Sequence, residues 1–231
     1  MGWLMPFFIA TLLPAQLGSG SGAAMRQVGF DGQKAGEPPA GFTCGLTGQG
    51  RAGSWRIVED PTAPTPPNAL AQMDEDATSY RFPVCVLDGV SARDVDLSVR
   101  FKPIRGTKDQ AAGLVWRYRD NDNYYVVRAN ALEGNVVLYK VEGGKRTDLK
   151  PKGSGLLAYG KKASVVAGSW GLLKVSVRGH LFEVYLGSDK LLDVEDSTFS
   201  DAGGVGLWTK ADSVSYFDDF RVEARQREGL H

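Results

Sequence analysis

Apolar residues recur at every second position from Ser54 onward, which is the spacing of half-buried β-strands. Residues 94–102 (DVDLSVRFK) are the clearest case, because their apolar side chains all fall on one face. Turn sequences such as DNDN (120–123) and EGGK (142–145) separate such stretches, and the prolines of residues 60–68 indicate an extended loop. The pattern predicts strands at 54–59, 81–87, 94–102, 111–119, 124–130, 135–142, 170–177, 181–186, 191–195, 205–210 and 214–223.

Short strands at this spacing, without a convincing amphipathic helix, are typical of an antiparallel sandwich or barrel. The 29 glycines and 11 prolines agree with that reading, since both residue types interrupt helices. We therefore expect an all-β fold: a jelly-roll β-sandwich of two antiparallel sheets that forms a single domain over residues 25–231.

The first 24 residues differ from the rest of the chain. Residues 2–14 are apolar and uncharged, GSGSG follows at 18–22, and Ala23 and Ala24 are small residues that a signal peptidase accepts. We expect a secretory signal peptide at 1–24. A poorly ordered tail or an added leader is the alternative, because no Lys or Arg precedes the apolar run. Pro6 and Pro14 interrupt that run, so no membrane span is expected in the mature, secreted or periplasmic protein.

The charge balance and the cysteine content narrow the function classes. Lys plus Arg and Asp plus Glu both number 27, so the formal net charge is zero. A nucleic-acid partner is not expected, because such binding needs a cationic face that displaces counterions. In an exported protein, Cys44 and Cys85 are expected to form a disulfide. The alternative is that they are two unrelated buried thiols.

Residues 113–133 (GLVWRYRDNDNYYVVRANALE) place charged side chains in the middle of predicted strands. Alternation puts Arg117 on the face of Val115 and Arg119, opposite Leu114, Trp116 and Tyr118. Because an unpaired buried arginine is costly, we expect a solvated sheet face that suits a sugar. Its predicted ligand-binding residues are Arg117, Arg128, Asn130, Trp208, Lys210 and Asp212. The alternative is that the aromatic residues belong to the core and the charges form salt bridges.

Carboxylates offer two further kinds of site. Glycosidases use two carboxyl groups roughly 5–10 Å apart, and the candidates near the predicted face are Glu133, Asp212 and Asp109. Asp218 and Asp219 are neighbours on a strand and point to opposite faces, so they cannot act together on one substrate. One of them, with Asp31, is a candidate ligand of a structural Ca²⁺. The alternative is that they accept hydrogen bonds from loop N–H groups.

Two long segments carry a resemblance to a known family: GLVWRYRDNDNYYVVRANALEGNVVLYKVEGGKRTDL and GGVGLWTKADSVSYFDDFRVE. They resemble the bacterial secreted family of 3-keto-disaccharide hydrolase domains, which is similar to the laminin-G and concanavalin A-like lectin/glucanase superfamily. FDGQKAGEPPAGF, DPTAPTPPNALAQ and RFPV fit the same pattern, so the resemblance covers nearly all of residues 28–223. It implies a jelly roll of two curved antiparallel sheets, but no motif transfers a catalytic residue.

The expected function is a secreted carbohydrate-binding module that recognises a sugar on its concave sheet face. The alternative is a glycoside hydrolase acting on a (keto-)disaccharide or a related glycoside. A third possibility is an adhesion module that binds a protein through the same face. The chain lacks the E-x-D-x-x-E run of concanavalin-like glucanases, which argues against an ordinary endoglucanase.

Overall fold

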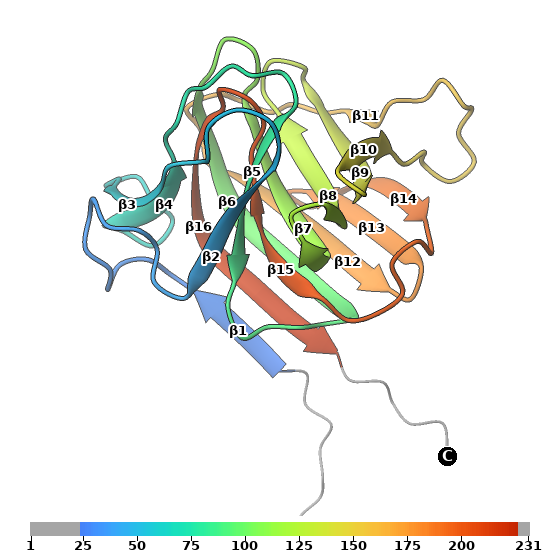
Figure 1. Ribbon diagram of the computed structural model, residues 1–231, viewed down its shortest axis with the longest axis horizontal. Helices are drawn as coiled ribbons and strands as arrows, with labels where there is room; N and C mark the ends of the chain where they lie inside the picture. The colour runs from blue at the N-terminus through green and yellow to red at the C-terminus, as the bar shows by residue number, and fades with distance from the viewer. Residues whose placement is uncertain (1–23, 226–231) are drawn as a thin grey trace, which may run out of the picture.

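The structure is a computed structural model that describes residues 24–225, and within this range it contains sixteen β-strands and no α-helix. Figure 1 shows the strands stacked as two layers, with β1 beside the end of β16. The predicted signal peptide lies, apart from Ala24, outside the described residues. No helix within residues 24–225 has the length and apolar character needed to cross a membrane.

Every strand pairing is antiparallel, which confirms the predicted jelly roll of two antiparallel sheets. Sheet A has the order β14 (Asp189–Glu195), β13 (Leu181–Leu186), β12 (Gly171–Arg178), β6 (Asp94–Arg105), β16 (Val214–Arg225), β4 (Asn68–Gln72) and β3 (Trp55–Glu59), with β1 (Ala24–Val28) beside β16. Sheet B has the order β10 (Lys145–Asp148), β9 (Asn135–Glu142), β8 (Asn123–Asn130), β7 (Ala111–Asp120), β15 (Gly204–Trp208), β5 (Arg81–Leu87) and β2 (Phe42–Gly48), with β11 (Lys161–Lys162) beside β9.

All the predicted strands are present, with ends that differ by a few residues. The structure adds β1, β2, β4, β10 and β11 to them. These five are short or carry little alternation, as in Lys145–Asp148, where every residue is polar.

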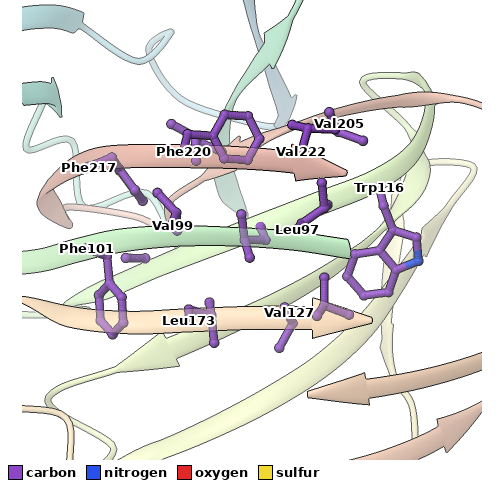
Figure 2. Close-up of a cluster of buried hydrophobic side chains, with 14 of the residues drawn as sticks. Leu97, Val99, Phe101, Trp116, Val127, Leu173, Val205, Phe217, Phe220 and Val222 are labelled. Carbon is purple, nitrogen blue, oxygen red and sulfur yellow. The ribbon is translucent and has the colours of Figure 1, made fainter. Parts of the chain in front are cut away.

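The main core lies between the two sheets. Leu97, Val99 and Phe101 of β6 are at most 2% exposed, and Figure 2 shows them on the side of the sheet that faces Trp116 and Val127 of sheet B. The clean alternation of β6 therefore reports a strand with one apolar face in the core and one polar face outside.

Sheet B is so strongly curled that its two ends meet across its outer face. Arg146 of β10 lies 4.5 Å from the ring centroid of Phe82 in β5 and 4.4 Å from that of Tyr139 in β9. The main-chain N–H of Arg146 also donates to the hydroxyl of Tyr80, just before β5. Since β10 and β5 are far apart in the strand order, this face of sheet B is concave.

Cys44 and Cys85 lie directly opposite each other on β2 and β5 and are joined by a disulfide, as predicted. Their Cα atoms are 3.9 Å apart. The bond attaches the edge strand β2 to its neighbour in sheet B.

Candidate functional site

A group of polar side chains gathers on the concave face of sheet B, where β8 ends. Arg128 and Asn130 point from β8 to this face, as their spacing predicted, and both are fully buried. The Arg128 guanidinium donates to Glu133 Oε2 at 2.6 Å and to the Tyr139 hydroxyl at 3.1 Å, and it also bonds Asn135 Oδ1. The buried Arg128 thus has one ionic partner and several neutral acceptors, and these bonds offset the cost of removing its charge from water.

Glu133 lies in the turn between β8 and β9, and about a third of its side chain is exposed. Asn130 Oδ1 accepts the main-chain N–H of Glu133 at 3.2 Å, which fixes the turn. Burial alone would raise the pKa of the Glu133 carboxyl. The charge and hydrogen bond of Arg128, the Asn135 amide and Lys210 outweigh burial and hold that pKa below its usual value. Glu133 is therefore a fixed, ionised hydrogen-bond acceptor that solvent can reach.

Asp109 and Lys210 form an ion pair beside Glu133. Lys210 Nζ lies 2.9 Å from Asp109 Oδ2 and 3.8 Å from Glu133 Oε1. Asn130 Nδ2 donates to Asp109 Oδ1 at 2.8 Å, so Asn130 joins both carboxylates. We call Asp109, Arg128, Asn130, Glu133 and Lys210 the Glu133 cluster.

Asp212 is close in sequence to this cluster but serves a different purpose. Its carboxylate accepts the main-chain N–H groups of Thr107, Lys108 and Asp109, at 2.6 to 3.2 Å. These bonds outweigh burial and lower the pKa of Asp212. Asp212 is one of the predicted ligand-binding residues, but it is only 4% exposed. It holds the loop that carries Asp109, which is a positioning role.

Tyr159 extends the cluster to the surface and was missed by sequence reasoning. Its hydroxyl lies 3.2 Å from Arg128 Nη2 and 2.5 Å from the Tyr139 hydroxyl, and the residue is 46% exposed. It belongs to the long loop between β10 and β11, which projects from the body in Figure 1. No local pattern in the sequence marks a loop tyrosine as a partner of a strand arginine about thirty residues away.

The expectation that Arg117 shares a face with Arg128 is wrong. A bulge after Trp116 gives Arg117 a positive φ of 48° and breaks the alternation of β7. Arg117 is only 1% exposed, lies over the ring of Phe182, and donates to the main-chain carbonyls of Arg93, Gly179 and Phe199. Its role is structural, at the edge of the main core.

Trp208 does lie on the concave face, but it is fully buried and cannot stack on a sugar in this conformation. It stacks on Phe82, donates from Nε1 to the Tyr124 hydroxyl at 3.2 Å, and lies under Arg146. Apolar and aromatic side chains thus fill the middle of the concave face. The Glu133 cluster occupies one end of it.

The calcium candidates do not form one ligand set. Asp218 is fully buried and accepts from the main-chain N–H and the hydroxyl of Thr65 at 2.8 and 2.9 Å. Burial raises the pKa of Asp218, and the nearby charge of Asp31 adds to the effect. Asp219 instead pairs with Arg221 at 2.9 Å. Within residues 24–225, no three His, Cys, Asp or Glu side chains are placed to hold a metal ion. Asp218 therefore follows the alternative, a carboxylate that satisfies loop N–H groups.

The cluster is better suited to binding than to proton transfer. Asp109 and Glu133 both accept from Asn130 Nδ2, at 2.8 and 3.3 Å, so these oxygens are at most about 6 Å apart, within the range of glycosidase pairs. A general acid, however, needs a raised pKa, and that of Glu133 is lowered. Asp109 is only 2% exposed and bonds Lys210 with both oxygens.

No protein-family model matches the chain, and no curated protein matches its sequence. Several solved structures share its fold. Carbohydrate binding module CBM66 from Bacillus subtilis is 19% identical, with a TM-score of 0.60 over 80% of this chain and 96% of that one. Domain 4 of AbnA, a GH43 extracellular arabinanase from Geobacillus stearothermophilus, solved in complex with arabinotriose, is 15% identical, with a TM-score of 0.55 over 88% and 94% of the two chains.

A third similar structure is a Bacillus subtilis protein of unknown function with a galectin-like fold. It is 14% identical, with a TM-score of 0.54 over 79% of this chain and 90% of that one. At these identities the comparisons show the β-sandwich fold alone. They do not single out the 3-keto-disaccharide hydrolase domains that the sequence resembles.

Proposed function

We propose that the protein is a carbohydrate-binding module and that the Glu133 cluster contacts the sugar. The observation that carries the proposal is the state of Glu133: ionised, held by Arg128 and Asn130, and one-third exposed. A fixed carboxylate beside a lysine ammonium offers an acceptor and a donor to neighbouring sugar hydroxyls. Tyr159 adds an exposed aromatic ring for a C–H face.

The fold comparisons support this proposal, because a carbohydrate binding module and an arabinotriose-bound domain have the same architecture. Secretion is part of it: the disulfide between Cys44 and Cys85 suits an oxidising compartment. Kinship with 3-keto-disaccharide hydrolase domains is also proposed, on the sequence segments that resemble them.

The decisive experiment is a glycan array with the wild-type protein, followed by calorimetry on the best hit. Glu133→Gln keeps the shape of the side chain but removes the charge, so we expect affinity to fall about tenfold. Glu59→Gln is the matched control, because Glu59 is an exposed glutamate on β3 of sheet A. It should bind like the wild type.

Product analysis on the same hit separates the two functions. Binding without turnover supports the module. Turnover that is lost in both Glu133→Gln and Asp109→Asn would favour the glycoside hydrolase, and unchanged binding by Glu133→Gln would remove the cluster from the site.

A further inference from the structure

A cleft of about 810 Å³ lies along the outer face of sheet A. It is bounded by the outer face of β6 and β12, the segment 162–171 and the turn between β13 and β14. Such a volume is within the usual range of ligand pockets. No residue of the Glu133 cluster lines it, although one lining residue, Lys162, contacts the main chain of Glu133.

The charge of the cleft is one-sided. Arg100, Lys162 and Lys174 line it, and the only acidic residue among its lining side chains is Asp189. Among residues 24–225, neither Arg100 nor Lys174 has a carboxylate within ion-pair distance, although many other cations of this neutral chain are paired. Lys162 donates only to the main-chain carbonyl of Glu133, at 3.0 Å. Lys174 Nζ also lies 5.4 Å from the ring centroid of Tyr185, an aromatic partner that leaves its charge uncompensated. Cations that line a cleft without ionic partners attract an anion.

The remaining lining is apolar and hydroxylic. The Trp170 indole donates from Nε1 to Thr62 Oγ1 at 3.3 Å, which holds the ring in place at the cleft. Leu172 and Leu186 continue the apolar surface, and Ser164 and Ser188 add hydroxyls. An aromatic ring with neighbouring hydroxyls suits the C–H faces and hydroxyl groups of a sugar.

We propose that this cleft is a second binding site and that its ligand is an acidic oligosaccharide, a chain of uronic acid residues. The carboxylates of the sugar pair with Arg100 and Lys174, and a pyranose ring packs on Trp170. An acidic peptide would satisfy the cations, and its main chain could bond the serine hydroxyls, but its acidic side chains offer no ring face to pack on Trp170. The site is independent of the proposed function of the Glu133 cluster.

The test is calorimetry with a short oligogalacturonate, in low and in physiological salt. We expect the wild type to bind it, and to bind it more weakly as salt screens the charges. Arg100→Gln/Lys174→Gln should lower affinity at least tenfold. Arg56→Gln/Lys145→Gln removes two exposed cations elsewhere and should bind like the wild type, as should Glu133→Gln.

Hydrogen exchange of the wild-type protein gives a second readout that needs no variant. Oligogalacturonate should protect residues 162–171. The proposal would be overturned by absence of binding, by equal binding of the Arg100/Lys174 variant, or by protection elsewhere. Equal or tighter binding of polyglutamate would show that the ligand is an acidic peptide and not a sugar. A protein that binds no neutral glycan but binds oligogalacturonate would disprove the function of the Glu133 cluster and leave this site standing.

Discussion

Arg117 and Arg128 are both buried cations on neighbouring strands, yet their partners give them different roles. Arg128 bonds side chains of the Glu133 cluster, whereas Arg117 bonds the main-chain carbonyls of Arg93, Gly179 and Phe199. Alternation along β7 and β8 predicts that the two arginines share a face of sheet B. The bulge after Trp116 moves Arg117 away from that face, and a local sequence pattern cannot reveal this bulge. At the bulge, Arg117 contacts Gly179 and Phe199, which are distant in the sequence.

Replacing Arg117 should therefore affect folding and leave binding intact. Arg117→Ala removes the donor to three main-chain carbonyls, of which that of Phe199 is buried, and opens a cavity beside Phe182. We expect the free energy of unfolding in urea to fall by about 3 kcal/mol. Affinity for the glycan hit should not change at a temperature where the variant is folded. Weaker glycan binding with unchanged stability would return Arg117 to the site.

Acid should weaken both stability and sugar binding, because the pKa of Glu133 and that of Asp212 are lowered in the folded protein. A carboxyl with a lowered folded pKa stabilises the protein above its unfolded pKa, and that stabilisation is lost as the pH falls through the folded pKa. We expect the urea midpoint and the glycan affinity to fall together below about pH 4. Glu133→Gln should show a smaller acid loss of stability than the wild type, and an equal loss would contradict the prediction.

Trp208 shows a further limit of prediction from sequence. Its position on the concave face follows from alternation, but its burial depends on Arg146, which reaches it from the other end of sheet B. The strand that carries Arg146 has no apolar alternation and was not predicted. Curling of a sheet is set by the packing of all its strands, so a local pattern does not show which face is covered.

Among the elements, β6 was readable because it has one face in the core and one outside. Strand β4 was missed, since all five of its residues are buried and it follows the proline-rich loop. Asp212 and the loop 106–109 illustrate a contact that alternation cannot predict, because the carboxylate caps N–H groups about a hundred residues away.

The loop that begins at Gly106 connects β6 to β7 and carries Asp109 of the Glu133 cluster. A Cβ atom at Gly106 would lie 1.9 Å from the carbonyl oxygen of Asp109, and φ there is +150°. Gly106→Ala must therefore move the loop and disturb the pairing of Asp109 with Lys210. We expect a loss of about 2 kcal/mol in stability and weaker glycan binding by calorimetry.

Gly89→Ala is the control for that substitution. Gly89 also has a positive φ, of +70°, but nothing lies within 4 Å of the added Cβ. It should cost about 1 kcal/mol and leave glycan binding unchanged. Equal binding by the Gly106 and Gly89 variants would show that the loop position does not matter to the site.

At the scale of the whole molecule, one main core joins the two sheets, and a smaller buried cluster lies on the concave face of sheet B. Leu97 and Phe217 of sheet A share that core with Trp116 and Leu207 of sheet B, and all are at most 2% exposed. The pairing of β6 with β16 joins residues as distant as Asp94 and Arg225. Such non-local pairings close long loops, so we expect them to form together with the core.

We therefore expect residues 25–231 to unfold in a single cooperative step, as a single domain does. Differential scanning calorimetry should show one transition whose van't Hoff and calorimetric enthalpies agree, and far-ultraviolet dichroism should follow the same curve. Reducing the disulfide between Cys44 and Cys85 should lower the midpoint without splitting the transition, because β2 lies within sheet B and not in a unit of its own. Two resolved transitions in the oxidised protein would mean that the sheets are stable separately, against the evidence of their shared core.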